Sequence, residues 1–354
     1  GKSAAMEMQG ILLAVSSMRE MPRWHFAEVS SLRLKPLFNM GLMANLAKVD
    51  LRSFHALAQR ECASHQKANE PVTDLLTIHH ALRDNRLPRL ETRLLLAHTL
   101  GHPRPAHAYA WLVAHDTDAL NDADAHRFNQ LVERRLAGEP IAYLIGHREF
   151  YGRDFRCSPA ALIPRPETEL LVDLALERLP ADFAGHILDV GTGTGCVAIT
   201  LALELQATRP RAQVTALDVS ADALALACEN AATLGAGNLR FVESHWFAAL
   251  AADEQVDLIV SNPPYIAPGD AHLTQGDLRF EPSLALADAV DGLESYRQLA
   301  AGAQKHLRRG GLLIVEHGFD QGESVPGLLR EAGFATVTQH RDLAGLPRVS
   351  VAVG

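Results

Sequence analysis

The spacing of apolar residues predicts two kinds of structure along this chain. From residue 73 to residue 137 apolar residues recur at helical intervals, which predicts a small helical bundle. The predicted helices cover Leu75–Leu82, capped by Thr73-Asp74, then Glu91–Leu100, Ala106–Ala114 and Ala125–Leu136, opened by Asn121-Asp122. Glycines and aromatic residues between residues 138 and 162 instead predict a β-hairpin that links this bundle to the rest.

From residue 163 to residue 354, short apolar runs alternate with helical segments. The predicted strands are Ile187–Val190, Val214–Asp218, Leu239–Glu243, Val256–Ser261, Leu312–Glu316, Ala335–His340 and Val349–Val353. The predicted helices are Thr168–Leu179, Cys196–Leu205, Ala221–Leu234 and Leu293–Leu307. Because strands that alternate with helices pair in parallel and are covered on both faces, this part is predicted to be a doubly wound α/β domain.

Residues 1–72 differ from both parts in composition. All six methionines of the chain lie within its first 43 residues, and no helical or strand period is sustained there. We therefore expect a disordered or non-native extension and not a third domain.

Charge and cysteine content narrow the classes of function. Residues 1–73 hold 9 Lys and Arg against 6 Asp and Glu, so residues 74–354 carry a net charge of −12 within a chain total of −9. An acidic body disfavours stable nucleic-acid binding, because it repels phosphate backbones. Four scattered cysteines favour reduced thiols in the cytoplasm, and no apolar run approaches the roughly 20 residues that span a bilayer. His98 and His102 stand one helical turn apart without an evident third ligand, so no metal site is predicted.

A glycine-rich loop follows the first strand of the α/β part. After Asp189 at the strand end, the loop contains Gly191, Thr192, Gly193, Thr194 and Gly195. A dinucleotide fingerprint would place its third glycine at Cys196, whereas these alternating glycines resemble those of class I methyltransferases. In such enzymes the glycines admit the ribose and amino acid of S-adenosylmethionine, and the acidic residue lies near its cationic methionine end.

A second acidic residue, Asp218, ends the next strand. A carboxylate at this position can accept hydrogen bonds from both ribose hydroxyls. Asp218 also precedes Ser220 at the start of a predicted helix, so helix capping is the alternative interpretation. The glycine loop and Asp218 together form the predicted cofactor site.

The motif Asn262-Pro263-Pro264-Tyr265 ends the strand Val256–Ser261. Prolines donate no backbone hydrogen bonds, so the rigid turn leaves the carbonyls of Asn262 and Pro263 aimed outward. The Asn262 side-chain oxygen and a neighbouring backbone carbonyl can accept both hydrogens of an –NH2 group and orient its nitrogen toward a methyl donor. Tyr265 can stack on a planar target. All four residues form the predicted substrate site, and Asn262, Pro263 and Tyr265 are the predicted catalytic residues; a plain strand-to-loop turn is the alternative.

Five separated motifs resemble those of the bacterial peptide chain release factor glutamine methyltransferases. They are Gly138–Gly146, Ile163–Glu169, the glycine loop, Asn262–Tyr265 and Arg279–Pro282, and the resemblance extends over residues 74–354. It implies a class I methyltransferase domain with a seven-stranded, mostly parallel sheet, a β-hairpin linker and a helical domain that helps to bind the substrate. It also implies cytoplasmic N5-methylation of the glutamine in the Gly-Gly-Gln motif of class 1 release factors, with S-adenosylmethionine as cofactor.

The resemblance also implies roles for single residues. Trp246 matches a residue that lines the adenine side of the cofactor, and Asn262 matches one that meets both cofactor and substrate. His245 departs from the family, which usually has an acidic residue near the adenine amino group. Arg165 and Glu167 either close over the cofactor or pair with each other.

Three other functions are compatible with parts of this pattern. Ribosomal-protein glutamine methyltransferases share the Asn-Pro-Pro-Tyr turn but typically have Cys where Gly191 stands. An adenine-N6 nucleic-acid methyltransferase would require a basic duplex-binding region, which the acidic body disfavours. A cofactor-binding module without activity would not require the amide-sized site around Asn262 and Tyr265.

Overall fold

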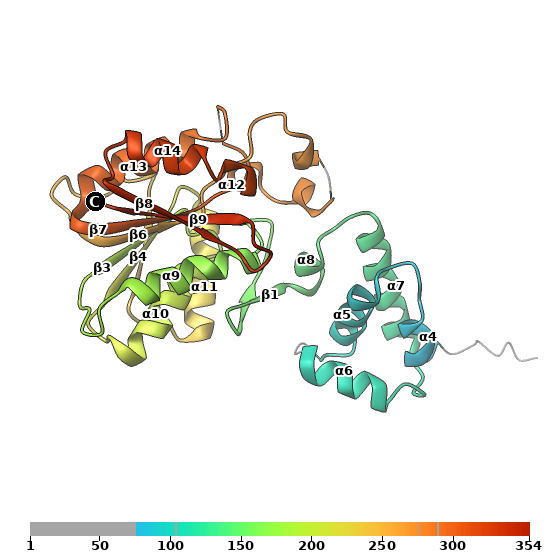
Figure 1. The fold of residues 1–354 in the computed structure, drawn as a ribbon. Coiled ribbons are helices and arrows are strands. Elements are labelled where there is room, and N and C mark those ends of the chain that lie inside the picture. Colours follow the sequence, from blue (N-terminus) through green and yellow to red (C-terminus); the bar gives the residue numbers. More distant parts are fainter. Residues whose placement is uncertain (1–75, 103–104, 275, 289) are drawn as a thin grey trace, which may run out of the picture. The chain divides into compact units, whose positions relative to one another are not determined.

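The computed structural model describes residues 76–354, apart from residues 103–104, 275 and 289 (Figure 1). These residues belong to one compact unit that begins at Asp74. The extension predicted for residues 1–72 lies outside the described residues. No helix in the described part of the chain is both long and apolar enough to cross a membrane.

The N-terminal part of the described chain is a helical bundle with its own core. Its helices are α4 (Ile78–Leu82), α5 (Arg89–Thr99), α6 (Pro105–Ala114), α7 (Asp122–Leu136) and α8 (Ile141–Ile145). The core residues Leu95, Leu96, Leu112, Phe128 and Val132 are at most 1% exposed and pack together. The side chain of Asn121 caps α7 by accepting a hydrogen bond from the Asp124 backbone N–H, as the sequence predicted.

The first helix begins later than the sequence predicted. Leu76 is not helical, because its carbonyl accepts a hydrogen bond from the Leu120 N–H at 2.8 Å, and Thr77 forms a β-bridge with Ala119. Thr77 then caps α4, since its side-chain oxygen accepts a hydrogen bond from the His80 N–H. Pairing with a distant segment therefore overrides the helical preference of this stretch. The predicted cap, Thr73-Asp74, lies outside the described residues.

The predicted β-hairpin is present, but it is shorter than the segment predicted for it. Strands β1 (His147–Phe150) and β2 (Arg153–Arg156) pair antiparallel around Tyr151 and Gly152, whose φ angles are 53° and 73°. Two consecutive positive φ angles are typical of tight hairpin turns. The residues before the hairpin form α8, which the sequence analysis missed. This helix follows Pro140 and ends at Gly146 with φ of 83°, and five residues are too few to display a helical period.

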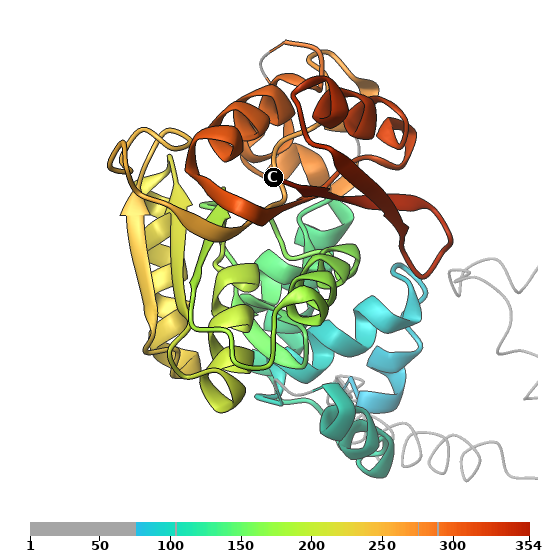
Figure 2. The ribbon, with the colours of Figure 1, turned by 60° about the vertical axis from the view of Figure 1, so that its left-hand side comes forward.

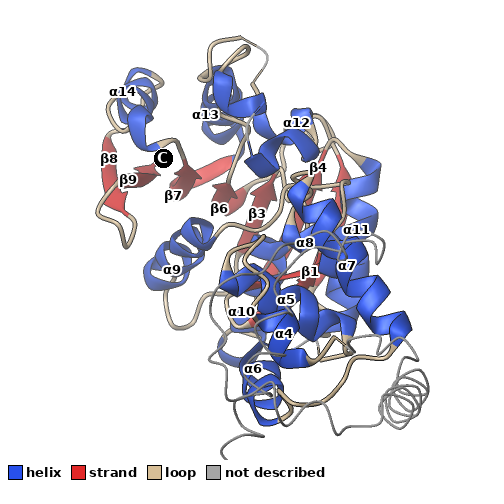
Figure 3. Ribbon diagram, turned by 90° about the vertical axis from the view of Figure 1, so that its right-hand side faces the viewer, coloured by secondary structure: helices blue, strands red, loops and turns tan. Residues whose placement is uncertain are grey.

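A seven-stranded sheet forms the centre of the remaining described residues. Its strands are β3 (His186–Val190), β4 (Gln213–Asp218), β5 (Leu239–Glu243), β6 (Val256–Ser261), β7 (Leu307–Glu316), β8 (Thr336–Arg341) and β9 (Pro347–Val353). The strand order is β5-β4-β3-β6-β7-β9-β8 (Figure 3). All neighbouring pairs from β5 to β7 are parallel, and β9 lies antiparallel to both β7 and β8 (Figure 2). The predicted doubly wound, mostly parallel sheet is confirmed.

Helices cover both faces of this sheet (Figure 1). On one face lie α9 (Glu169–Arg178), α10 (Cys196–Thr208) and α11 (Ala221–Leu234), and on the other lie α13 (Glu294–His306) and α14 (Ser324–Glu331). The short elements η3 (Pro166–Thr168), η4 (Ala271–Thr274), η5 (Gly276–Phe280), α12 (Ser283–Leu286) and η6 (Phe319–Gln321) connect them. Helix α14 was not predicted because Pro326 and Gly327 interrupt its helical signal. A proline in the first turn removes only an N–H that has no helical partner, and Val325 and Leu329 still bury fully.

Candidate active site

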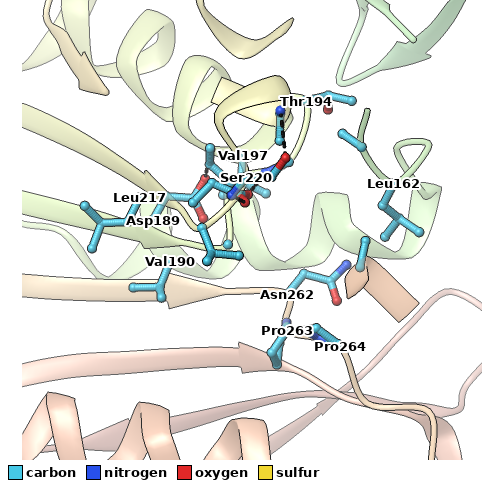
Figure 4. A pocket seen from close by; sticks show the side chains of 18 of the residues that line it. Leu162, Asp189, Val190, Thr194, Val197, Leu217, Ser220, Asn262, Pro263 and Pro264 are labelled. Carbon is cyan, nitrogen blue, oxygen red and sulfur yellow. Dashed lines mark hydrogen bonds between the residues drawn. The ribbon is translucent and has the colours of Figure 1, made fainter. Parts of the chain in front are cut away.

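A cavity of about 260 Å³ opens at the carboxyl ends of β3, β4 and β6 (Figure 4). The chain runs from β3 outward to β5 on one side and from β6 outward to β7 on the other, so the strand order reverses between β3 and β6. Open α/β sheets bind their ligands at such a reversal, because the diverging loops leave a crevice there. The glycine loop and the Asn-Pro-Pro turn both border this cavity.

The glycine loop adopts a backbone conformation that favours glycine at each of its three alternating positions. The φ angles of Gly191, Gly193 and Gly195 are 77°, 56° and 81°. At Gly195 a Cβ would also stand 2.7 Å from the Ile199 side chain and 3.1 Å from the Ala227 Cβ, so this glycine lets α10 and α11 approach closely. At Gly191 a Cβ would meet nothing within 4 Å, and this part of the loop faces the open cavity.

Two carboxylates border the loop, and both are held by backbone N–H groups. Asp189 is 2% exposed, and its Oδ2 accepts hydrogen bonds from the Thr192 hydroxyl at 2.7 Å and the Ala198 N–H at 3.2 Å. Asp218 accepts from the Gly193 N–H through Oδ2 and from the Ser220 N–H through Oδ1, each at 2.9 Å. Burial raises the pKa of Asp189 to about 7 and also raises the pKa of Asp218.

The capping interpretation of Asp218 is wrong, because Ser220 itself caps α11. Its hydroxyl accepts a hydrogen bond from the Ala223 N–H at 3.2 Å. Asp218 instead connects the glycine loop to the start of α11, and it lines the cavity. Each carboxylate oxygen has a second lone-pair direction, which leaves Asp218 able to accept hydrogen bonds from a ligand.

Trp246 and His245 line the same cavity from the segment after β5. Trp246 has a φ of 51°, which is rare for a large side chain. Its backbone is held in this conformation by Ser244, whose hydroxyl donates to the Trp246 carbonyl at 2.8 Å and accepts from the Ala249 N–H at 3.1 Å. The tight turn therefore places both residues at the wall of the cavity that the glycine loop also lines.

The first three residues of the Asn-Pro-Pro-Tyr motif lie at the cavity, and the fourth packs against the protein core. Asn262, Pro263 and Pro264 line the cavity, and Figure 4 shows them beside one another at the end of β6. The Ser261 hydroxyl donates to the Val190 carbonyl at 2.6 Å and so ties the start of the turn to β3. Tyr265 is not among the residues that line the cavity. It packs against the core around Val325 and Tyr296, and burial raises its pKa to about 12.

The segment before α9 contributes cavity residues of which only Arg165 was assigned a role from the sequence. Residues 160–165 and Thr168 line the cavity, and Ala161 lies next to the glycine loop, with its Cβ 3.9 Å from where a Cβ on Gly193 would stand. Thr168 accepts a hydrogen bond from the Asn262 Nδ2 at 3.1 Å. The only signal in the sequence was the position of Thr168 within the motif Ile163–Glu169.

Arg165 does not pair with Glu167, one of the two alternatives predicted from the sequence, because it has a different partner. Arg165 forms an ion pair with Glu281, whose side chain is fully buried, whereas Glu167 is exposed. Glu281 also accepts a hydrogen bond from the Ile163 N–H at 2.9 Å. The pair therefore joins two of the five motifs, Ile163–Glu169 and Arg279–Pro282.

Replacing Glu281 by glutamine is expected to lower stability by about 1–3 kcal/mol, because it removes the charge that faces Arg165 in a buried setting. Thermal unfolding measures the loss. The same substitution at the exposed Glu331, at the end of α14, serves as a control. Equal melting temperatures for the two variants would contradict the structural role of Glu281.

Comparisons with known proteins identify both parts of the chain. The family model of the Methyltransferase small domain matches residues 168–278, and that of the PrmC N-terminal domain matches residues 75–146. A "Release factor glutamine methyltransferase" of Bordetella pertussis is 52% identical over 269 residues, which cover 76% of this chain and 96% of that relative. Relatives of the same name from Neisseria gonorrhoeae and Xylella fastidiosa strain Temecula1 are each 48% identical, over 78% and 77% of this chain and 97% and 95% of their own lengths. This chain belongs to the release factor glutamine methyltransferase family.

Proposed function

We propose that this protein transfers a methyl group from S-adenosylmethionine to the side-chain nitrogen of the glutamine in the Gly-Gly-Gln motif of class 1 release factors. The observation that carries the proposal is the position of the Asn262 amide, at the wall of the cavity that the glycine loop also lines. The relatives are named as methyltransferases of a release factor glutamine, which supports this choice of substrate. Because release factors act in translation, the proposed reaction takes place in the cytoplasm.

The residues around the cavity fit S-adenosylmethionine. Gly191 leaves its backbone open to the cavity, where a side chain would take up space needed by the cofactor. Asp218 offers carboxylate oxygens to the two ribose hydroxyls. Asp189 provides a buried negative charge for the cationic methionine end, and Trp246 provides a flat apolar surface for the adenine. When bound, the cofactor supplies an electrophilic methyl group on a positively charged sulfur.

The Asn-Pro-Pro turn is suited to hold the target nitrogen. The side-chain oxygen of Asn262 and the backbone carbonyl of Pro263 can each accept one hydrogen of the glutamine –NH2 group. This leaves the nitrogen lone pair pointed at the methyl group, and both acceptors stabilise the positive charge that develops on nitrogen. Directly after methyl transfer the amide nitrogen still carries both hydrogens and a positive charge. In this form it is strongly acidic, so it loses a proton without a strong base. Tyr265 supports the turn from the core side, since its backbone carbonyl accepts a hydrogen bond from Gln321 Nε2 at 3.2 Å.

Cofactor affinity is expected to rise with pH between about 6 and 8. Burial raises the pKa of Asp189 to about 7, so its carboxyl is increasingly protonated below this pH and then attracts a cationic ligand less strongly. The gain should be larger for S-adenosylmethionine than for its demethylated product, whose sulfur is neutral. Isothermal titration calorimetry across this range measures the change. Asp189→Asn should remove most of the pH dependence, and an unchanged slope would contradict this role of Asp189.

Peptide mass spectrometry tests the proposed function directly. We expect incubation with S-adenosylmethionine and a purified release factor to add one methyl group to the glutamine of the Gly-Gly-Gln peptide. A release factor with that glutamine changed to alanine is the control and should remain unmodified. The proposal would be rejected if the protein methylated a ribosomal protein or the adenine of a nucleic acid instead of the release factor, or if it methylated none of these substrates.

A further inference from the structure

The side chain of Asn262 can serve the proposed function in only one of its two orientations. A carboxamide rotated by half a turn has almost the same shape but presents –NH2 in place of oxygen. In that orientation it would face the hydrogens of the glutamine amide and could not accept them. The following inference rests on the proposed function, and it concerns the residues that select the productive orientation.

Thr168 contacts the nitrogen end of this amide. The Asn262 Nδ2 donates a hydrogen bond to the Thr168 Oγ1 at 3.1 Å. Thr168 is 2% exposed and stands at the N-cap position of α9, yet its side chain makes no capping hydrogen bond. A threonine at this position commonly caps its helix. Here the hydroxyl is available for Asn262 and for one further partner.

The carboxyl group that we assign as the further partner of the Thr168 hydroxyl is that of Glu316, the last residue of β7. Ser261 pairs with Val315 in the parallel register of β6 and β7, so Glu316 lies at the same edge of the sheet as Asn262. Glu316 is 1% exposed, and its Oε2 has no hydrogen-bond partner in the described part of the structure. Burial raises the pKa of this carboxyl to about 7, and the Thr168 hydroxyl opposes this shift in part.

Other charged and titratable groups also face Glu316. Arg348 and Arg165 favour its ionised form, and Glu167 opposes it. Tyr265, Tyr296 and Cys196 also interact with it electrostatically. At neutral pH and above, the two arginines and the hydroxyl of Thr168 stabilise the carboxylate against its burial.

The charge of Glu316 determines the direction of the hydrogen bonds. A carboxylate can only accept, and a threonine hydroxyl has a single hydrogen to donate. Once Thr168 donates that hydrogen to Glu316, it has only lone pairs left for Asn262, and only the –NH2 end of Asn262 can meet them. We propose that Thr168 and Glu316 are positioning residues that hold the Asn262 amide with its oxygen toward the substrate. A protonated Glu316 can instead donate to the Thr168 oxygen. The Thr168 hydroxyl can then donate its own hydrogen to the side-chain oxygen of Asn262, which allows the opposite orientation of the amide.

Substitution of Thr168 tests the proposal at saturating cofactor and release factor. Thr168→Val keeps the shape of the side chain and removes the hydroxyl, and we expect kcat to fall by about 10–30-fold with little change in cofactor affinity. Thr168→Ser restores the hydroxyl and should recover most of kcat. Thr200→Val is the matched control: Thr200 is a buried threonine of α10 whose hydroxyl has no hydrogen-bond partner among the described residues, so kcat should not change.

The pH dependence of kcat gives a readout that a merely structural role would not change. Below its pKa Glu316 is protonated and the orientation of Asn262 is no longer fixed, so kcat of the wild type should fall to a lower plateau as the pH drops below about 7. Glu316→Gln has both a donor and an acceptor at every pH. Its kcat should therefore be lower than that of the wild type already above pH 7, and it should not fall further as the pH drops below about 7.

Three outcomes would overturn the inference. A folded Thr168→Val variant with the kcat of the wild type and of Thr200→Val would show that the hydroxyl does not position Asn262. If Thr168→Val does not fold, a Glu316→Gln variant that shows the same fall in kcat at acidic pH as the wild type would overturn it. If the wild-type protein leaves the release factor unmodified, the proposed function itself is rejected. If the wild type is active and the Thr168→Val variant is equally active, only the positioning role is rejected.

Discussion

Replacing Asn262 by alanine is expected to lower kcat for glutamine methylation by about 10²–10³-fold, the usual loss when a group that stabilises developing charge is removed. The substitution deletes one of the two acceptors that we propose for the target –NH2 group, and it leaves the Pro263 carbonyl as the other. The cofactor dissociation constant should change by less than about 5-fold, because the glycine loop and Asp218 remain. Single-turnover rates at saturating cofactor measure the loss in the chemical step.

Asn238→Ala provides the control for this experiment. Asn238 directly precedes β5, so it lies at the amino ends of the parallel strands, whereas Asn262 lies at their carboxyl ends. There the Asn238 Nδ2 donates to the Ala212 carbonyl at 3.4 Å. The control variant should lose little activity. If Asn262→Ala retained more than about a third of the wild-type kcat, Asn262 would not be the acceptor that we assign.

Replacing Asp218 by alanine is expected to weaken S-adenosylmethionine binding by about 30–300-fold, which corresponds to roughly 2–3.5 kcal/mol. The variant loses the proposed acceptor of the ribose hydroxyls. It also leaves the N–H groups of Gly193 and Ser220 without their carboxylate partner, so the glycine loop is held less firmly. Calorimetric titration measures the affinity, and Asp218→Asn should show a smaller loss because it keeps one acceptor.

Asp222→Ala is the matched control for Asp218, because Asp222 is exposed in the first turn of α11, the helix that begins next to Asp218. Its affinity for S-adenosylmethionine should equal that of the wild type. An affinity of Asp218→Ala within about twofold of this control would contradict the role of Asp218 in the cofactor site.

Local patterns in the sequence were sufficient to predict most of the sheet and its helices. Helix α11 and strands β5 and β6 begin and end at the predicted residues, because each is a periodic or apolar run between clear turn signals. Helices α8 and α14 were missed for opposite reasons. The first is too short to show a period, and the second contains Pro326 and Gly327 yet is stabilised by the burial of Val325 and Leu329.

Contiguous motifs also located much of the candidate site. The glycine loop and Asn262–Pro264 border one cavity, as parallel strands that end at one edge of a sheet require. Tyr265 follows them in sequence but lies outside the cavity wall, because the chain turns into the core after Pro264. Periodicity and residue type contain no information on such a change of direction.

The sequence by itself therefore determined the class of sheet, the glycine loop and the Asn-Pro-Pro turn at the cavity, because each depends on neighbouring residues. Only the tertiary structure decided which distant residues support them. Asn262 and Thr168 are 94 positions apart, and Ile163 and Glu281 are 118 positions apart. Glu316 lies beside Asn262 only because β6 and β7 are neighbours in the sheet. Strand order and register create these contacts, and both follow from how the whole chain packs.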